Sequence, residues 1–344
     1  MSLAILQSGI HTSATWRRFL WACAIVNGVL GVGCMLYVVE TLLLQSERRF
    51  VENPADTMTR AMGLTHFTIG WLFLFTSPRL RNRAALARLT FWTLFGVAFC
   101  AVFAWAGGDK NPLGIIAFYS FFFFHETYDE AHLFKHSGEL SPAAPQPDRF
   151  LSSLALSVSL TFLALLAGFQ IVRGPLLGRS NLLQHVSSSW LVAAAFAALI
   201  LAVLAWVATL QRAWILHGSI RETIANYQPL LAVYAGLIAI LLIGSPLGSV
   251  GYNFVILLHG SMWLFFACGK MNGRNPKGAN LWTWLRHTPA GLITLHVALM
   301  IAALALFALR SHVWERTGLV CDLVSKSWFP YWGIMHIAMS FWRK

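Results

Sequence analysis

Long apolar runs separated by short polar segments dominate the chain, and most of them approach the ~20 residues that an α-helix needs to cross a bilayer. Nine such runs predict transmembrane helices, at residues 19–44, 61–77, 89–107, 113–132, 150–172, 190–210, 230–243, 247–268 and 291–309. A tenth apolar segment, at residues 328–342, is barely long enough; it could cross at a thin point, re-enter the membrane or lie in the interface. The pattern predicts an all-α fold, a polytopic integral membrane helical bundle of about 9–10 transmembrane helices.

The composition also indicates a membrane protein. Of the 344 residues, 57% are hydrophobic and 11% are charged, and the mean hydropathy is +0.63. About a quarter of the residues of a soluble domain are charged, so a soluble fold of this composition would expose apolar surface that it cannot bury. Soluble dehydrogenases, nucleic-acid-binding domains and secreted disulfide scaffolds are therefore excluded. The five cysteines form no CxxC pair.

The net charge of +12 is explained by an uneven distribution of Lys and Arg across the membrane. If the N-terminus lies inside and all ten segments cross, 16 of the 25 basic residues fall on the inner side and 9 on the outer side. The two most basic loops, at residues 79–88 and 270–286, then lie on the same side. Because cytoplasmic loops carry an excess of Lys and Arg, the N-terminus is predicted to be cytoplasmic. In a bacterium the chain would lie in the cytoplasmic membrane, and no nucleic acid partner is expected.

The whole chain, residues 1–344, is predicted to form a single transmembrane domain. One loop, at residues 137–147, has linker composition, with three prolines and two alanines. It marks a possible division between the first four spans and the rest.

The most unusual polar segment is the inner end of the fourth predicted span. Three of the chain's 13 acidic residues lie there within five positions. On a continuous helix, four potential metal ligands share one face at spacings i, i+4, i+7 and i+11. They are His125, Asp129, His132 and His136. Glu126 and Glu130 lie beside that face as further ligands or as catalytic proton acceptors. Imidazoles and carboxylates in this arrangement are typical of sites for one or two first-row metal ions.

Two other interpretations of this segment remain open: a solvated polar helix end, or a contact with lipid headgroups or a partner. The spacing of His132 and His136, with the surrounding acids, resembles the histidine boxes of membrane-bound di-iron desaturases and hydroxylases. Those families carry further boxes with adjacent histidines, whereas this sequence contains no His-His pair. The chain is therefore not assigned to them.

Four more histidines lie inside predicted spans and are candidate cofactor ligands: His66, His259, His296 and His336. At ~1.5 Å per residue, His125, His259 and His296 are expected at overlapping depths in the inner half of the bilayer. His66, near the outer end of its span, is not expected to reach them easily. Five of the nine methionines lie within four residues of these histidines, and thioether with imidazole suits Cu(I) or haem iron. Methionine is also a common filler of apolar helices.

These observations favour a multi-pass membrane metal-dependent oxidoreductase acting on a lipid, isoprenoid or quinone-like substrate. The expected cofactor is iron, as a di-iron centre or haem b, with copper as a weaker candidate. One alternative is a haem b or copper protein for electron transfer or metal handling. Another is a proton-coupled transporter, in which the same acids and histidines form a relay, or an accessory subunit of a membrane complex. The expected partners are membrane lipids and a lipophilic small molecule.

Overall fold

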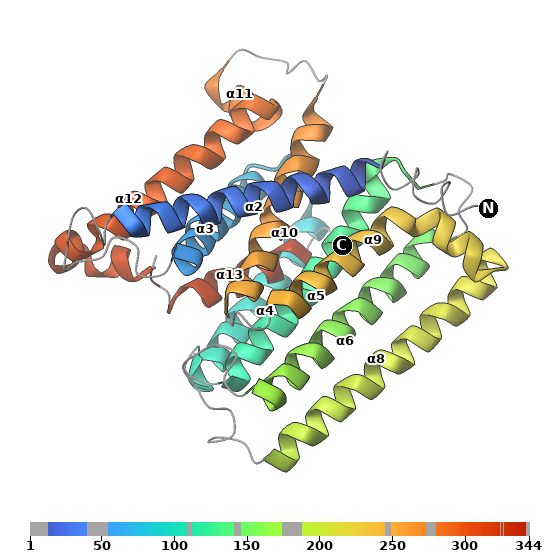
Figure 1. Cartoon of the computed structure of the whole chain (residues 1–344). Helices are drawn as coiled ribbons and strands as arrows, with labels where there is room; N and C mark the ends of the chain where they lie inside the picture. The colour runs from blue at the N-terminus through green and yellow to red at the C-terminus, as the bar shows by residue number, and fades with distance from the viewer. Residues whose placement is uncertain are drawn as a thin grey trace. The chain divides into compact units, whose positions relative to one another are not determined.

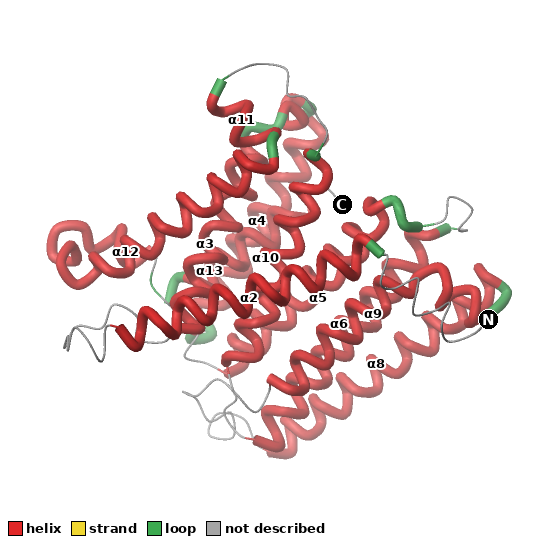
Figure 2. Tube along the Cα trace, turned by 45° about the horizontal axis from the view of Figure 1, so that its top comes forward, coloured by secondary structure: helices red, strands yellow, loops and turns green. Residues whose placement is uncertain are grey.

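The computed structural model contains helices and loops and no strand among the residues it describes (Figure 2). These residues are 13–39, 54–108, 112–140, 146–173, 188–244, 249–272, 280–323, 325 and 327–341. An all-α fold is what the long apolar runs require, because a backbone surrounded by hydrocarbon must satisfy its hydrogen bonds within each segment. The end of the first predicted span, the break at Ser245-Pro246 and part of the 137–147 linker lie outside the described residues.

The chain divides into two compact units, each formed from two separate stretches of sequence. Unit 1 comprises residues 1–21 and 110–255, and unit 2 comprises residues 22–109 and 256–344. Helices α2 (Ala14–Val38) and α10 (Ser249–Met271) contribute residues to both. The 137–147 linker lies within unit 1.

Unit 1 is built on four long helices. They are α5 (Pro112–Ser137), α6 (Pro147–Arg173), α8 (Ser188–His217) and α9 (Ile220–Gly244). Helix α6 runs beside α8 and also packs against α5, and α9 contacts both α8 and α5 (Figure 1). The core between α5 and α6 includes the stacked rings of Phe123 and Phe162, whose centroids are 4.7 Å apart. Helix α9 begins ten residues before the predicted span at 230–243 and contains Pro229.

Unit 2 combines long and short helices, in addition to its parts of α2 and α10. They are α3 (Pro54–Phe75), the 3-10 helix η2 (Pro78–Arg81), α4 (Arg83–Trp105), α11 (Leu281–His287), α12 (Pro289–Leu323) and α13 (Phe329–Ser340). Helix α13 packs against both α3 and α4, and α12 packs against α3 and α11. A cluster of Leu74, Ala85, Leu89 and Met339 joins α3, α4 and α13. The candidate site lies where α13 meets α3.

Among the described residues, seven helices are long and apolar enough to span a membrane. They belong to α2, α4, α6, α8, α9, α10 and α12, and the chain is an integral multi-pass membrane protein. Helices α3 and α5 are long enough but carry several polar or charged side chains. Helix α13 has 12 residues, or about 18 Å, which is too short for the ~30 Å hydrocarbon core. The cytoplasmic N-terminus stays a prediction.

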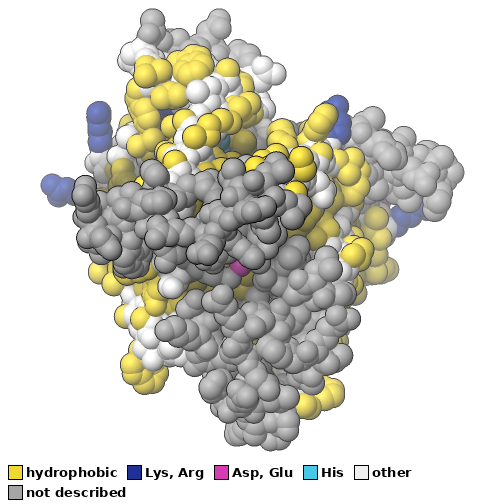
Figure 3. All heavy atoms as spheres, turned by 60° about the vertical axis from the view of Figure 1, so that its left-hand side comes forward, with side chains coloured by type: hydrophobic (Ala, Val, Ile, Leu, Met, Phe, Trp, Pro, Cys, Tyr) yellow, Lys and Arg dark blue, Asp and Glu magenta, His cyan; other side chains and the backbone are white. Residues whose placement is uncertain are grey.

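The outward side chains of these helices are mainly apolar. Trp105, Ile215 and Ile243 are 89%, 73% and 74% exposed. In the view of Figure 3, hydrophobic side chains cover most of the described surface. Such exposure would be unfavourable in water, but it is the normal state of a helix that faces lipid.

Candidate metal centre

Three histidines from three helices of unit 2 converge on one point. His66 lies on α3, His259 on α10 and His336 on α13. Each offers a ring nitrogen, and the three nitrogens lie within 4.8 Å of one another. The ring of His66 is 5.2 Å from that of His259 and 4.7 Å from that of His336, centroid to centroid. His66 and His259 are 6% and 4% exposed, so this cluster is shielded from solvent.

Two glycines on α3 allow α13 to approach closely enough to deliver His336. Gly63 and Gly70 are seven residues apart and therefore lie on one face of the helix. A Cβ on Gly70 would lie 3.1 Å from Cε1 and 3.3 Å from Nδ1 of His336. A Cβ on Gly63 would lie 2.7 Å from ring atoms of Phe329, at the first turn of α13. The lack of side chains at Gly63 and Gly70 thus lets Phe329 and His336 of α13 pack closely against α3.

Aromatic side chains surround the three imidazoles. The ring of Trp263 lies 5.5 Å from that of His66, and the ring of Phe67 lies 4.8 Å from that of His336. One turn after Phe67 on α3 and one turn before His336 on α13, Trp71 and Trp332 are in contact, with centroids 5.2 Å apart. The imidazoles are therefore polar groups in an apolar, aromatic environment. Such an environment excludes water and increases the strength of electrostatic contacts.

The spacing of the three nitrogens is close to that of a metal site. An ion equidistant from three atoms at most 4.8 Å apart would lie at most about 2.8 Å from each, against about 2.0–2.1 Å for a zinc–imidazole bond. Each ring would have to move inward by at most roughly 0.7 Å to reach that bond length. The donor set is uniform, three imidazoles, which suits zinc, copper, iron or nickel.

The methionines near His336 face a different neighbour. Gly96 of α4 approaches α13 so closely that a Cβ there would lie 3.0 Å from Sδ of Met335. Met339 belongs to the apolar cluster that joins α13 to α4. These two thioethers therefore pack against α4, whereas His336 contacts α3. The two methionines are close to His336 in the sequence because all three lie on α13, where the methionine side chains pack against α4.

His296 stays outside the cluster. It lies on α12, and its Nδ1 is 2.9 Å from the carbonyl oxygen of Leu292 one turn earlier. Among the described residues it belongs to no group of three metal-ligating side chains. Similar predicted depth placed His259 and His296 together, but the structure does not place His296 in the cluster.

The expectation that His66 could not easily reach His259 is corrected by the packing of α3 against α10. Helix α3 begins at Pro54, seven residues before the predicted span, so His66 lies near its middle. In addition, α13 is a short helix, which places His336 beside the middle of α3. Gly63 and Gly70, which flank His66 on one helix face, were the available sequence signal of a close helix contact.

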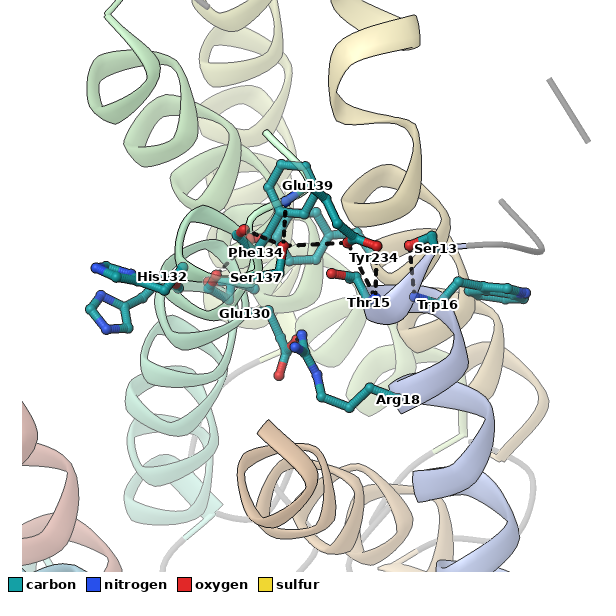
Figure 4. Close-up of polar contacts among 12 residues, drawn as sticks. Ser13, Thr15, Trp16, Arg18, Glu130, His132, Phe134, Ser137, Glu139 and Tyr234 are labelled. Atoms are coloured by element: carbon teal, nitrogen blue, oxygen red, sulfur yellow. Dashed lines mark hydrogen bonds and ion pairs between the residues drawn. The ribbon is translucent and has the colours of Figure 1, made fainter. Parts of the chain in front are cut away.

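The polar segment of α5 forms a second group, within unit 1. Helix α5 continues past the predicted span end at residue 132 to Ser137, and Nε2 of His125 lies 3.3 Å from a carboxylate oxygen of Asp129 one turn later. Glu126 and Glu130 are completely buried. Arg18 extends from α2 toward Glu130 and forms an ion pair with it at 3.3 Å (Figure 4). The proposed roles of Glu126 and Glu130 as proton acceptors stay predictions.

His132 and His136 lie at the exposed end of the same helix. Their rings are 4.2 Å apart, and Nδ1 of His136 is 2.9 Å from the carbonyl oxygen of His132. Both residues are exposed, whereas His125 is 1% exposed. In the part of the chain that the structure describes, no group of three metal-ligating side chains includes either of them. The predicted four-residue face thus divides into a buried His125 with a half-buried Asp129, and an exposed pair.

Comparisons of the chain with known protein families, with curated proteins and with solved structures found no match. The assignment of function therefore depends on the geometry of the chain itself.

Proposed function

We propose that unit 2 holds one transition-metal ion on His66, His259 and His336, and that the protein is a membrane metal-dependent oxidoreductase. The observation that carries this proposal is the convergence of three imidazole nitrogens within 4.8 Å, from three helices that are distant in sequence. Ionisable side chains inside a membrane helix bundle are rare and often mark functional sites. One ion could bind all three imidazoles at once.

The donor set favours a centre that does chemistry over one that only stabilises the fold. Structural zinc sites use four protein ligands, whereas catalytic sites keep one position open for water or substrate. Three imidazoles leave such a position. Phe67 and Trp263 make the surroundings apolar, which suits a lipid, isoprenoid or quinone-like substrate. Iron is the first ion to test because it combines imidazole ligation with redox chemistry.

The ring spacing supports a single ion in preference to haem b. A haem bound between two histidines needs the full thickness of its macrocycle between the two rings. The centroid separations of 4.7 and 5.2 Å leave no room for it between His66 and either neighbour. Met335 and Met339 also face α4, which weakens the argument for a thioether ligand of copper. The transporter and accessory-subunit hypotheses remain predictions without a specific supporting contact.

The test is metal analysis of the full chain, purified in detergent, before and after incubation with Fe(II), Zn(II) or Co(II). We expect about one ion per chain in the parent protein. The single variants His66→Ala, His259→Ala and His336→Ala should each lose most of it. Co(II) should give visible absorption bands of four-coordinate intensity, which the three variants lack.

Two matched controls separate the site from a general effect of removing a histidine. His296→Ala removes a membrane histidine whose Nδ1 contacts its own helix, and His132→Ala removes an exposed one. Both should retain the parent's metal content. A parent protein that stays metal-free after incubation, or His66→Ala protein that binds as much metal as the parent, would overturn the proposal.

A further inference from the structure

One end of unit 2 gathers positive charge at the junction of α3, η2, α4 and α11. Four arginines lie on η2 and the first turns of α4, and all four are exposed. They are Arg79, Arg81, Arg83 and Arg88. Helix η2 packs against α4, and α11 is tied to the end of α3 by Arg286. We call this surface the basic end of unit 2.

The sequence around these arginines contains no acidic residue. Residues 57–108 and 256–314 contain no Asp or Glu, so the sequence of η2, α4 and α11 is free of acids. Among the described residues, none of the four arginines forms an ion pair. These arginines are thus concentrated where the described residues form no ion pair with them.

The start of α4 adds to the positive potential. Asn82 caps this helix, and its Oδ1 accepts hydrogen bonds from the backbone N–H groups of Ala84 at 2.9 Å and Ala85 at 3.4 Å. The first turn has no acidic residue and begins with Arg83. A helix N-terminus carries a partial positive charge and is stabilised by anions. An anion bound at this surface would therefore be stabilised by the start of α4 as well as by the arginines.

Arg286 makes α11 a fixed part of the basic end. Its Nη1 donates to the carbonyl and hydroxyl oxygens of Thr76, at 3.0 and 2.9 Å, and its Nη2 donates to the carbonyl of Phe73 at 3.4 Å. Its guanidinium also lies over the rings of Phe73 and Trp282. Trp282 of α11 therefore lies beside the last turn of α3, with its ring 6.3 Å from that of Phe73.

Apolar side chains are interspersed with the cations. Phe75 and Leu86 are 61% and 49% exposed, and Leu281 at the start of α11 is 70% exposed. Trp282 and Trp284 are also exposed, as is typical of residues at a membrane interface. A soluble phosphate or a nucleic acid would leave these groups in water. A phospholipid satisfies both features, with its phosphate on the arginines and its acyl chains on the apolar side chains.

We propose that the basic end of unit 2 binds the headgroups of anionic phospholipids and holds this end of the unit in the leaflet that contains them. Each arginine near an anionic surface contributes about a fivefold preference at most. Salt weakens the interaction because the arginines are exposed. This inference is independent of the metal centre.

The test measures lipid selectivity of the full chain in nanodiscs of phosphatidylcholine that contain spin-labelled phosphatidylglycerol or spin-labelled phosphatidylcholine. The fraction of each label immobilised by the protein gives the preference. We expect the parent to prefer phosphatidylglycerol several-fold and to lose this preference as salt is added. The triple variant Arg79→Gln/Arg81→Gln/Arg83→Gln should lose most of it at low salt.

The triple lysine variant at the same positions is the matched control, because it keeps the charge and should keep the preference. Arg221→Gln removes an exposed charge from α9 in unit 1 and should change little. Equal unfolding temperatures of all variants in phosphatidylcholine alone verify that the triple glutamine variant is folded. The proposal fails if the parent shows no preference, if salt does not reduce it, or if the folded glutamine triple matches the parent.

Discussion

The imidazole rings of His66 on α3 and His336 on α13 lie 4.7 Å apart and meet at an angle of 63°. This contact joins residues that are 270 positions apart in the sequence. It exists because Gly70, one turn after His66, presents no side chain to the incoming ring. The close approach of the two helices therefore depends on Gly70 of α3 as much as on the histidines.

Replacing Gly70 with alanine should weaken metal binding even though it should favour the helix. The new Cβ would lie 3.1 Å from Cε1 of His336, so the ring must shift by a few tenths of an ångström. Displacement of a ligand by its supporting residues typically weakens metal affinity by about 10-fold or more. Alanine is about 1 kcal/mol better than glycine inside a helix, so loss of α3 would not explain the result. Competition with a chelator measures the affinity.

Gly260→Ala is the matched control. Gly260 follows His259 on α10, and a Cβ there would lie 3.8 Å from Cε of Met62 and 3.9 Å from the ring of His66, which are ordinary contacts. Its affinity should stay close to that of the parent. Equal affinities for Gly70→Ala and the parent would show that the approach of α13 does not set the ligand geometry.

The ion pair between Arg18 and Glu130 should contribute strongly to the stability of the protein. Arg18 is 7% exposed and Glu130 is fully buried, and their side chains are 3.3 Å apart. Arg18→Met leaves a carboxylate without this cation, and removal of one member of a buried pair lowers the free energy of unfolding by about 3–5 kcal/mol. Arg18→Met/Glu130→Gln should recover part of this loss because it removes both charges. Unfolding in detergent mixtures measures both variants.

The pair formed by Lys135 and Asp148 provides the comparison, because its side chains are 39% and 68% exposed. Exposed pairs contribute about 0–1 kcal/mol, so Lys135→Met should change stability little. Similar losses for Lys135→Met and Arg18→Met would show that burial does not govern the contribution of these ion pairs.

Glu139 should stabilise the start of α2. Its two carboxylate oxygens accept a hydrogen bond from the backbone N–H of Thr15, at 3.3 and 3.2 Å (Figure 4). The first N–H groups of a helix have no partner within it, and loss of a capping acceptor lowers stability by about 0.5–2 kcal/mol. Glu139→Ala should show this loss. Glu139→Gln keeps an acceptor and should lose less, and an equal loss for both variants would point to charge alone.

The helices could be predicted from the sequence because hydrocarbon leaves the backbone few alternatives. The predicted span at 190–210 corresponds to α8 at Ser188–His217, and the span at 291–309 corresponds to the first part of α12. The ends of the helices differ from the predicted bounds because apolarity does not indicate where a helix ends in the membrane interface. Helix α5 continues past the predicted end at residue 132 because its polar last turns remain helical.

The candidate metal centre could be predicted only in part. The sequence identified His66, His259 and His336 as candidate ligands, but it placed the main site at His125, Asp129, His132 and His136. Periodicity shows which residues share a face of one helix, and this correctly brought His125 to Asp129. It does not show which helices pack together. The cluster of His66, His259 and His336 depends on contacts between α3, α10 and α13. Those contacts depend on the positions of glycines and on the lengths of the helices.

A hydrogen-bonded seam between α6 and α8 should stabilise unit 1 within the membrane. The hydroxyl of Thr209 on α8 lies 2.7 Å from that of Ser153 and 2.9 Å from that of Ser157, both on α6. Interhelical hydrogen bonds of this kind contribute about 0.6 kcal/mol on average, and up to about 1.7, to membrane protein stability. Thr209→Val keeps the shape but removes both bonds, so the free energy of unfolding should fall by about 1 kcal/mol. Thr93→Val is the control, because the Thr93 hydroxyl donates to Leu89 of its own helix. If the two valine variants lose the same stability, the seam contributes no more than a bond within one helix.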